Sequence, residues 1–363
     1  MADIYCLSDL EESSNTERTL RLIELNDSET IDVSKFEELE NIEIIQNYSL
    51  KKITGLNKQI KKIYYPKHED DALYSELLKN ILYQVDLPSL LAKKDLQILL
   101  SVLAIPILKE KYPDFFDRFQ SYSSKIKFID ITKTFLREDT ISACTFNEAK
   151  KAEAYIDDWI KKNILPTMNS IEKFAKIYEF VIGLDYDNDS EKDRGDACSA
   201  FKMVLRKKGI CVGYSQLLKY MCLKCRLQCE YVQACGRKNN YVFNEEGDNL
   251  SLCALDTTIP NLDNFIISNH AIVRFSPDGI NWLFSDPTND SLFVRTARKQ
   301  NKKIRGWYLF CLPYDKMINF NVPHMYDPNG NEIIVSSELT KEISEQLGCV
   351  QKNMFDSNSQ CKA

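Results

Sequence analysis

A chain of 363 residues with 44% hydrophobic and 28% charged residues can bury a sizeable core, which excludes the disordered and fibrous classes of protein. Its formal net charge of -6 argues against nucleic acid as a partner, because phosphate binding needs a concentrated positive surface. The first residues, MADIYCLSDLEESS, lack the positive and apolar regions of a secretory signal. Twelve cysteines without a compact repeating spacing fit free thiols in a reducing compartment, so we expect a cytoplasmic protein.

Residues 1–70 carry a repeated apolar pattern. Leu20-x-x-Ile23-x-Leu25 aligns with Leu39-x-x-Ile42-x-Ile44 and with Ile60-x-x-Ile63-x-Tyr65, so Ile23 corresponds to Ile42 and Ile63, and Ile31 lies one repeat before Leu50. This pattern resembles a degenerate leucine-rich repeat, in which each unit supplies one short strand and an irregular return. A plain meander of three strands with accidental periodicity is the alternative. We expect a buried strand array that includes Leu20, Ile23, Ile42, Ile44 and Ile63.

Residues 71–166 are predicted to form a helical bridge between these repeats and the C-terminal half. One face of the first predicted helix carries Leu73, Leu77, Leu78, Ile81 and Leu82. The longest apolar run, LQILLSVLAIPIL from Leu96 to Leu108, is much shorter than the roughly 20 residues that a helix needs to span a bilayer. We therefore interpret this run as a buried core helix and expect no membrane partner.

Residues 167–320 are predicted to form an α+β domain, followed by a C-terminal extension over 321–363. SIEKFAKIYEFVIGL predicts a helix that is capped by Ser170 and ends at Gly183. Its buried stripe would consist of Ile171, Phe174, Ile177, Tyr178 and Val181. Strands are predicted later, in CEYVQACG, SLCALDTTI, NHAIVRF, NWLFSDPT and GWYLFCL. An order of helices first and strands later indicates the α+β class.

Cys211, in the stretch LRKKGICVGYSQLLKYMC, is the first candidate for chemistry. A helix with its first turn at Cys211 is predicted by the apolar face of Leu217, Leu218, Met221 and Cys222. A thiol in a first turn lies near unpaired backbone N–H groups, whose partial positive charge favours the thiolate. Gly209 and Gly213 would let the loop bend sharply and let the helix pack closely on a sheet. These features predict a nucleophile.

His270 and Asp286 are the candidate partners of this thiol, because they lie on two strands joined by the turn SPDG. A three-residue loop of Pro277, Asp278 and Gly279, with Gly279 in the left-handed conformation, would place His270 directly opposite Asp286. The carboxylate could then hold one ring nitrogen and leave the other for the thiol. A two-residue loop would instead place Ser285 opposite His270.

Three further cysteines, Cys222, Cys225 and Cys229, raise the question of a metal site. A structural zinc site would need a second ligand pair at matching spacing, and the chain has only three histidines. On a helix, Cys222 and Cys225 share a face with Leu218 and Met221, where cysteine behaves as a small hydrophobe. Core packing is the favoured interpretation, and we expect neither a metal nor a cofactor.

Three segments together resemble the core of the transglutaminase-like family, which has a papain-like fold. The family pattern around its cysteine is similar to Gly209, Ile210, Cys211, Gly213, Tyr214 and Ser215. His270 and Ala271 match its His-Ala pair, and Asp286, Pro287 and Thr288 match its Asp-Pro-Thr triplet. The resemblance covers roughly Ser170 to Leu312. It implies a nucleophile at Cys211, a base at His270 and an orienting carboxylate at Asp286.

The sequence also departs from this family. Many bacterial members carry Trp and Asn after the His-Ala pair, where this chain has Ile272 and Val273. Neither the calcium loop of mammalian cross-linking enzymes nor the paired Cys-x-x-Cys zinc module of peptide-N-glycanases is found. The acyl acceptor therefore stays open between water and an amine.

Two functions follow as hypotheses. The first is a cysteine acyl enzyme that acts on peptide or glutamine carboxamide bonds, by hydrolysis or by transfer to an amine. The second is a catalytically silent protein of the same fold that binds a protein partner through the N-terminal repeats. In either case the expected partners are proteins or peptides.

Overall fold

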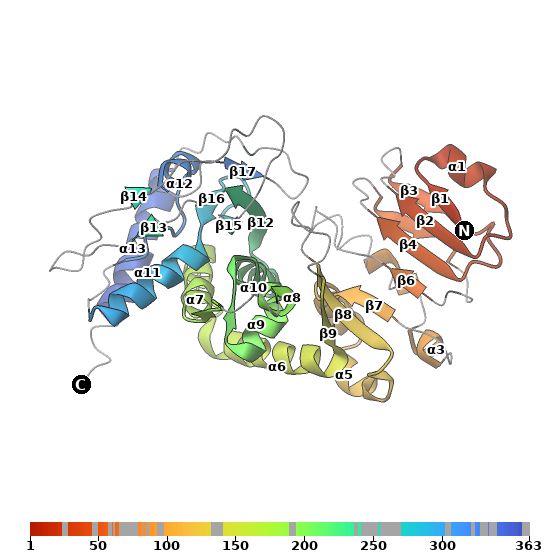
Figure 1. Ribbon diagram of the computed structural model, residues 1–363, viewed down its shortest axis with the longest axis horizontal. Helices are drawn as coiled ribbons and strands as arrows, with labels where there is room; N and C mark the ends of the chain where they lie inside the picture. Colours follow the sequence, from red (N-terminus) through yellow and green to blue (C-terminus); the bar gives the residue numbers. More distant parts are fainter. Residues whose placement is uncertain are drawn as a thin grey trace. The chain divides into compact units, whose positions relative to one another are not determined.

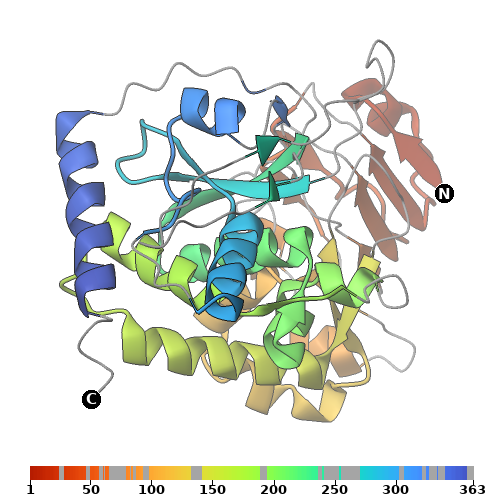
Figure 2. The ribbon, with the colours of Figure 1, turned by 60° about the vertical axis from the view of Figure 1, so that its left-hand side comes forward.

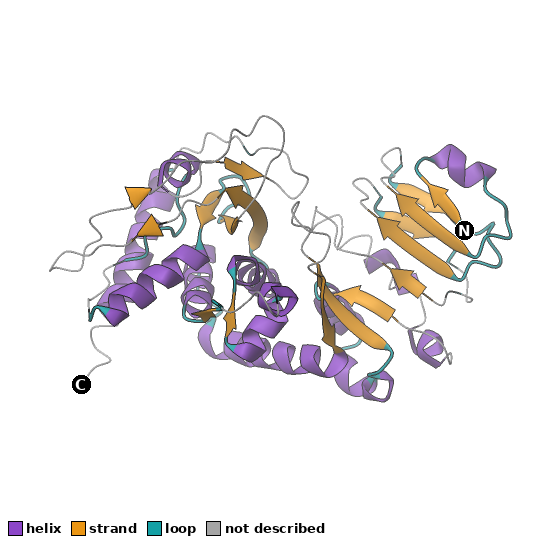
Figure 3. Ribbon diagram, viewed as in Figure 1, coloured by secondary structure: helices purple, strands orange, loops and turns teal. Residues whose placement is uncertain are grey.

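The computed structural model describes residues 1–23, 28–45, 50–56, 60, 62–64, 79–81, 83–84, 87–92, 98–131, 141–188, 194–235, 239–240, 253–254, 270–301, 306–320, 324–326, 333 and 340–357. The chain forms two compact units, the first over Met1–Thr132 and Ile141–Lys151 and the second including Ala152–Ala363. Strands predominate in the first unit and helices in the second (Figure 3). This mixture agrees with the predicted α+β class. No helix among the described residues is long and apolar enough to cross a membrane.

The first unit is built on a sheet whose strands follow one another in chain order (Figure 1). These strands are β1 (Ala2–Ile4), β2 (Thr19–Ile23), β4 (Asn41–Ile45), β6 (Lys62–Tyr64), β7 (Ile98–Ser101), β8 (Ile126–Ile131) and β9 (Ile141–Thr145). All neighbours pair in parallel except β8 and β9. Two further strands, β3 (Thr30–Asp32) and β5 (Lys52–Thr54), form a separate parallel pair. Stacked parallel strands in chain order exclude the alternative of a plain meander.

The register of this array differs from the predicted alignment between its first two repeats. Ile42 pairs with Leu20 and not with the predicted Ile23, whereas its predicted match to Ile63 is found. Ile31 likewise pairs with Ile53 and not with Leu50.

The corrected register changes which side chains enter the core. Leu20, Leu22, Ile42 and Ile44 are buried, while Ile23 is only half-buried. The prediction for Ile23 is therefore wrong, because alternation along β2 gives its inward position to Leu22. The side chains of Leu25, Ile63 and Tyr65 lie outside the described residues.

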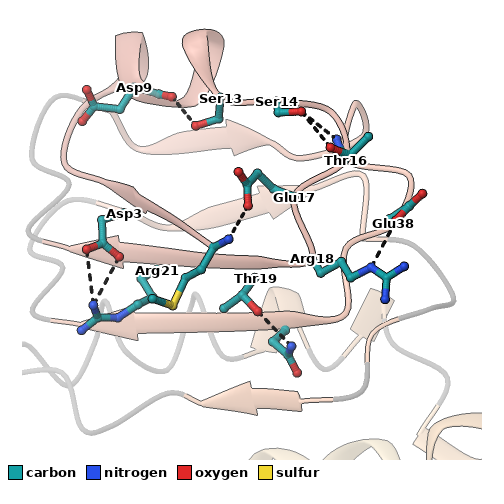
Figure 4. Close-up of polar contacts among 12 residues, drawn as sticks. Asp3, Asp9, Ser13, Ser14, Thr16, Glu17, Arg18, Thr19, Arg21 and Glu38 are labelled. Atoms are coloured by element: carbon teal, nitrogen blue, oxygen red, sulfur yellow. Dashed lines mark hydrogen bonds and ion pairs between the residues drawn. The ribbon is translucent and has the colours of Figure 1, made fainter.

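Polar side chains line the other face of these strands (Figure 4). The register sets Asp3 beside Arg21 and Arg21 beside Glu43, so the guanidinium contacts both carboxylates, at 3.3 and 3.4 Å. Asn41 Nδ2 donates to Thr19 Oγ1 at 3.0 Å in the neighbouring row. Exposed ion pairs contribute at most about 1 kcal/mol each, so the buried apolar rows stabilise the array more than this polar face does.

Strands β7, β8 and β9 continue this sheet within the region where a helical bridge was predicted. The apolar run at Leu96 to Leu108 is not one helix, since it forms β7 and then, after a turn, α4 (Ala104–Lys111). Five aromatic rings from residues 115–119, from β8 and from residue 146 pack together: Phe115, Phe116, Phe119, Phe128 and Phe146. Other helices among the described residues of this unit are α1 (Leu7–Glu12), α3 (Leu87–Ala92), α5 (Phe115–Arg118) and a 3-10 turn, η1 (Gln120–Tyr122), and residues 79–81 and 83–84 are also helical. On the apolar face of the first helix predicted in the bridge, Ile81 is buried. The other four residues of that face lie outside the described residues: Leu73, Leu77, Leu78 and Leu82.

The second unit packs helices on an antiparallel sheet of order β16-β15-β12-β17 (Figure 2). The sheet strands are β12 (Gln228–Cys235), β15 (His270–Ser276), β16 (Leu283–Ser285) and β17 (His324–Tyr326). Two small pairs are β10 (Asp185–Tyr186) with β11 (Lys208–Gly209) and β13 (Asn239–Asn240) with β14 (Cys253–Ala254). The helices are α6 (Phe146–Asn163), which begins in the first unit, α7 (Ser170–Ile182), α8 (Arg194–Cys198), α9 (Ala200–Arg206), α10 (Cys211–Lys224), α11 (Pro287–Lys299), α12 (Tyr314–Phe320) and α13 (Lys341–Ser357).

Helix α7 begins at Ser170, so its cap lies one residue before the predicted one. Asn169 and not Ser170 is the N-cap: its side chain accepts the Glu172 N–H, and Glu172 accepts the Asn169 N–H in return, both at 2.9 Å. The predicted stripe from Ile171 to Val181 is buried, and Gly183 ends the helix as expected. Stacking of Phe174 on Phe275 of β15, with ring centroids 4.1 Å apart, joins this helix to the sheet.

Helix α10 is the central helix of the unit, in contact with β12, β15, α7, α8, α9 and α11. The predicted close approach at Gly213 is real, but its partner is α8 and not the sheet. A Cβ on Gly213 would lie 2.5 Å from the carbonyl oxygen of Ala197. That same oxygen accepts the Ile210 N–H at 3.0 Å, so the start of α10 is tied to the end of α8.

The segment GWYLFCL, residues 306–312, is not the predicted strand. Asp290 of α11 accepts the N–H groups of Tyr308 and Leu309, and Cys311 has a positive φ of 52°. Leu312 forms only an isolated bridge with Phe284. The side-chain carboxylate therefore replaces a neighbouring strand as the partner of these backbone amides.

The predicted C-terminal extension belongs to the second unit, because α13 packs against α7. The rings of Trp307 and Phe355 meet edge to face there, 5.4 Å apart. Residues 358–363 lie outside the described part.

Candidate active site

Cys211 is the first residue of α10, as the sequence predicts. Its N-cap, Ile210, offers no side-chain hydrogen bond to the first turn. The half-buried Cys211 packs at the edge of an apolar cluster formed by Ala197, Cys198, Ile210, Val212, Tyr231 and Ala271. The thiol therefore lies between an apolar wall and the positive end of a long helix.

His270 and Asp286 are in direct contact. His270 is the first residue of β15, and its Nε2 lies 2.7 Å from Asp286 Oδ2. The histidine side chain is 11% exposed and the carboxylate is fully buried. The Cys211 thiol contributes to raising the pKa of His270, which sets it near the imidazole. Because Nε2 contacts the carboxylate, Nδ1 is the ring nitrogen left for a further partner.

The hairpin that joins His270 to Asp286 has a different register from the predicted one. Val273 pairs with Ser285 and Phe275 with Leu283. If this register is extended along the hairpin, the residue opposite His270 is Thr288 and not the predicted Asp286. Gly279 has the predicted positive φ, 81°, but the loop is longer because Asp278 accepts the N–H groups of Ile280 and Asn281, at 2.9 and 2.8 Å.

The predicted contact between His270 and Asp286 is still made, because the observed register differs from the predicted one by two residues. A slip of one residue moves every side chain to the other face of the sheet, whereas a slip of two keeps the face. Asp286 is consequently a diagonal neighbour of His270, within reach of an imidazole ring. It also lies just beyond the end of β16, as the N-cap of α11.

Electrostatics favour a charged histidine. Burial alone lowers the pKa of His270, but the charge of Asp286, the hydrogen bond that His270 donates to it and the interaction with Cys211 outweigh burial and raise the pKa to about 10. Burial raises the pKa of Asp286, and the charge of His270 together with the N–H donors of His270 and Asn289 reverses this, so the pKa lies below its usual value. At neutral pH an imidazolium therefore faces a carboxylate on one side and the thiol on the other.

Two features of the site were missed in the sequence. Asn289 donates from Nδ2 to Asp286 Oδ2 at 2.7 Å and from its backbone N–H to Oδ1 at 3.0 Å. Asp290, fully buried, accepts the hydroxyl of Tyr178 at 2.7 Å. A signal for Asn289 was available in the run Asp-Pro-Thr-Asn from Asp286, since Asp is a common N-cap and Pro a common first residue of a helix. Nothing in the local sequence reveals the Tyr178 contact, which joins residues that are far apart along the chain.

The other cysteines of the stretch CLKCRLQC belong to the core. Cys222 and Cys229 are buried and Cys225 is half-buried, as the core interpretation predicts. Burial, followed by the neighbouring Cys229 thiol, holds the pKa of Cys222 well above its usual value, so this thiol is protonated. No group of three or more His, Cys, Asp or Glu side chains could hold a metal ion within the described ranges.

Comparison with known proteins gives only partial similarity. No family model matches the sequence, and no curated protein matches it. One similar solved structure is a candidate cysteine protease from Cytophaga hutchinsonii, at 18% identity over 38% of this chain and 37% of that chain, with a TM-score of 0.24. Another is a TGase, at 17% identity over 49% of this chain and 38% of that chain, with a TM-score of 0.28. The chain thus spans well under half the length of either protein.

Proposed function

We propose that this chain is a transglutaminase-like cysteine acyl enzyme that acts on peptide or glutamine carboxamide bonds. The observation that carries the proposal is the 2.7 Å contact between His270 Nε2 and Asp286 Oδ2, beside a thiol at the first residue of α10. A carboxylate that holds an imidazole by one nitrogen, with a nucleophile at the other, is the arrangement of a catalytic triad. Cys211 is the nucleophile, His270 the acid and base, and Asp286 the residue that orients the ring.

The reaction follows from the charges of the site. The Cys211 thiolate attacks the carbonyl carbon and forms a C–S bond, and the tetrahedral intermediate then breaks its C–N bond. The His270 imidazolium gives its proton to the leaving amine or ammonia. Neutral His270 next removes a proton from water or from a primary amine, which attacks the thioester and restores the thiolate. Water yields an acid, and an amine yields a new amide.

Incubation with a peptide library and a fluorescent primary amine tests this proposal. We expect peptide cleavage, ammonia release or amine incorporation, and the Cys211→Ala variant should abolish all three. Cys225→Ala is the matched control, because Cys225 caps the opposite end of the same helix and is half-buried like Cys211. Turnover that persists in Cys211→Ala contradicts the site assignment.

Selective alkylation is a second test that needs no substrate. Iodoacetamide at mildly acidic pH modifies thiolates, so Cys211 should react much faster than the other cysteines. Cys349 is the informative comparison. It is more exposed than Cys211 but does not belong to the proposed site, so exposure alone would make it the faster of the two. Equal slow labelling of both thiols would favour the silent, binding-only alternative.

We further propose that the first unit is a degenerate leucine-rich repeat that binds a protein partner. Support comes from the parallel pairing of Leu20 with Ile42 and of Ile42 with Ile63, a spacing within the range of roughly 20–29 residues that such repeats have. Pull-down of cellular proteins by the full chain, with and without charge reversal at Arg21, tests the partner. Identical captured sets would contradict a role for this strand face.

A further inference from the structure

Asn289 makes three polar contacts around Asp286 and His270. Its Nδ2 donates to Asp286 Oδ2 at 2.7 Å, its backbone N–H donates to Asp286 Oδ1 at 3.0 Å, and its Nδ2 lies 3.5 Å from His270 Nε2. Both oxygens of a fully buried carboxylate are thereby fixed by one residue. Oδ2 receives two donors, the side chains of His270 and Asn289.

An ordinary helix cap does not account for the side-chain contact. At the start of α7 the residue in the same position, Glu172, accepts the N–H of the N-cap residue Asn169. At the start of α11 the N-cap N–H of Asp286 is already used, because it donates to the carbonyl of Leu309 at 2.9 Å. Asn289 therefore does not close a capping box, and its amide N–H is directed to the oxygen that faces His270.

We infer that Asn289 is a positioning residue, which holds the Asp286 carboxylate in the orientation that aligns His270 with Cys211. This inference rests on the proposed function of the Cys211, His270 and Asp286 site. The Asn289 amide adds a second donor to Oδ2 beside the imidazole, and so restrains rotation of the carboxylate about its Cβ–Cγ bond.

The chain contains a matched control in the hairpin loop that precedes β16. Asp278 and Asn281 in this exposed loop repeat the pattern, with the Asn281 N–H on Oδ1 at 2.8 Å and Asn281 Nδ2 on Oδ2 at 2.6 Å. The local geometry is the same, but no described contact links this pair to His270. Asn281→Ala thus removes the same bond without touching the site.

The test compares Asn289→Ala and Asn281→Ala in the full-length chain. We expect Asn289→Ala to slow alkylation of Cys211 by about 10- to 100-fold, by analogy with the loss seen when a hydrogen-bond partner that orients a metal-ligating side chain is removed. Asn281→Ala should stay within about twofold of wild type, the scatter expected for a surface change. A nitrogen-proton NMR correlation supplies a second readout: the chain has three histidines, and the His270 Nε2–H signal should weaken or shift only in Asn289→Ala.

The outcomes separate this inference from the proposed function. A wild-type alkylation rate and an unchanged His270 signal in Asn289→Ala overturn the positioning role. Uniform labelling of all cysteines in the wild type contradicts the proposed function instead, and the His270 signal still decides the role of Asn289. Asn289→Ser, a milder change at the same helix position, serves if the alanine variant does not fold, and the same loss of the His270 signal is expected.

Discussion

Asp286 links a structural task to a chemical one. It caps α11 through Oδ1 and holds His270 through Oδ2, and its backbone N–H donates to Leu309. A buried carboxylate without partners would cost several kcal/mol, and three donors on its two oxygens offset that cost. The same donors keep it ionised, which in turn keeps His270 charged.

Replacing Asp286 by asparagine separates these tasks. Asp286→Asn keeps an oxygen for the helix cap but loses the charge that favours the imidazolium and the correct ring orientation. We expect kcat/KM to fall by roughly 10²- to 10⁴-fold, as in other triads. The measurement is steady-state turnover of the best peptide found in the library.

Asp278→Asn is the control for this change, because Asp278 has the same Asp-x-x-Asn contacts in the exposed hairpin loop. It should leave turnover within about twofold of wild type, as for most surface changes. Wild-type activity in Asp286→Asn would leave only a dyad of Cys211 and His270.

At the scale of the element, the position of the thiol depends on how closely α10 approaches α8. Gly213→Ala would drive a Cβ to 2.5 Å from the Ala197 carbonyl oxygen, a separation that backbone atoms must move to relieve. We expect destabilisation by about 1–3 kcal/mol or more, typical of overpacking, and a displaced Cys211. Thermal melting and the alkylation rate of Cys211 measure the two effects.

Gly348→Ala is the opposite case and the control for Gly213. Gly348 lies inside α13, and nothing lies within 4 Å of a Cβ built there. Alanine should therefore stabilise the helix by about 0.5–1 kcal/mol, since it lowers the entropy lost on folding. Equal melting shifts in both variants would mean that the close approach of α8 and α10 is not rigid.

The strand array of the first unit offers a second test at this scale. Leu22 is fully buried and Ile23 is half-buried, the reverse of what the alignment of Ile23 with Ile42 implies. Leu22→Ala should cost about 2–5 kcal/mol and Ile23→Ala less than about 1.5 kcal/mol. Calorimetric melting of the two variants decides between the observed register and the alignment of Ile23 with Ile42. A larger loss of stability for Ile23→Ala than for Leu22→Ala would favour that alignment.

Local signals in the sequence were sufficient for some elements and not for others. The stripe of α7 and the start of α10 at Cys211 follow from periodicity along one helix, which depends on few distant contacts. The hairpin register did not follow, because the Asp278 carboxylate captures two backbone N–H groups and lengthens the loop.

Elements whose backbone partners are distant side chains were the least predictable. Residues 306–312 have strand-like composition, yet Asp290 and Ser285 supply partners for their N–H groups. The meeting of His270 with Asp286 was predictable because only the parity of the register decides which face a side chain occupies. The role of Asn289 needed the position of Leu309, whose carbonyl takes the N–H of Asp286.

At the scale of the whole molecule, the two units can be followed separately. All three tryptophans, Trp159, Trp282 and Trp307, belong to the second unit, so tryptophan fluorescence reports unfolding of the unit that holds the candidate site. Two buried groups of that unit bind protons more tightly when folded. Burial raises the pKa of Asp290 from its ordinary 3.8 to about 7, although Tyr178 and the Leu309 N–H oppose it. The pKa of His270 rises from 6.5 to about 10 as the net result of burial and its contacts with Asp286.

These two groups predict how the stability of the second unit depends on pH. A group whose pKa rises on folding binds more protons in the folded state, so the free energy of unfolding falls as pH rises between its two pKa values. The contribution of Asp290 should be complete near pH 4 and lost by about pH 7, and that of His270 complete near pH 6.5 and lost through about pH 10. Urea unfolding followed by tryptophan fluorescence across this range measures the slope. Asp290→Asn should flatten only the acidic half and His270→Gln only the alkaline half, whereas a wild-type stability that rises between pH 4 and 7 would show that Asp290 is ionised throughout.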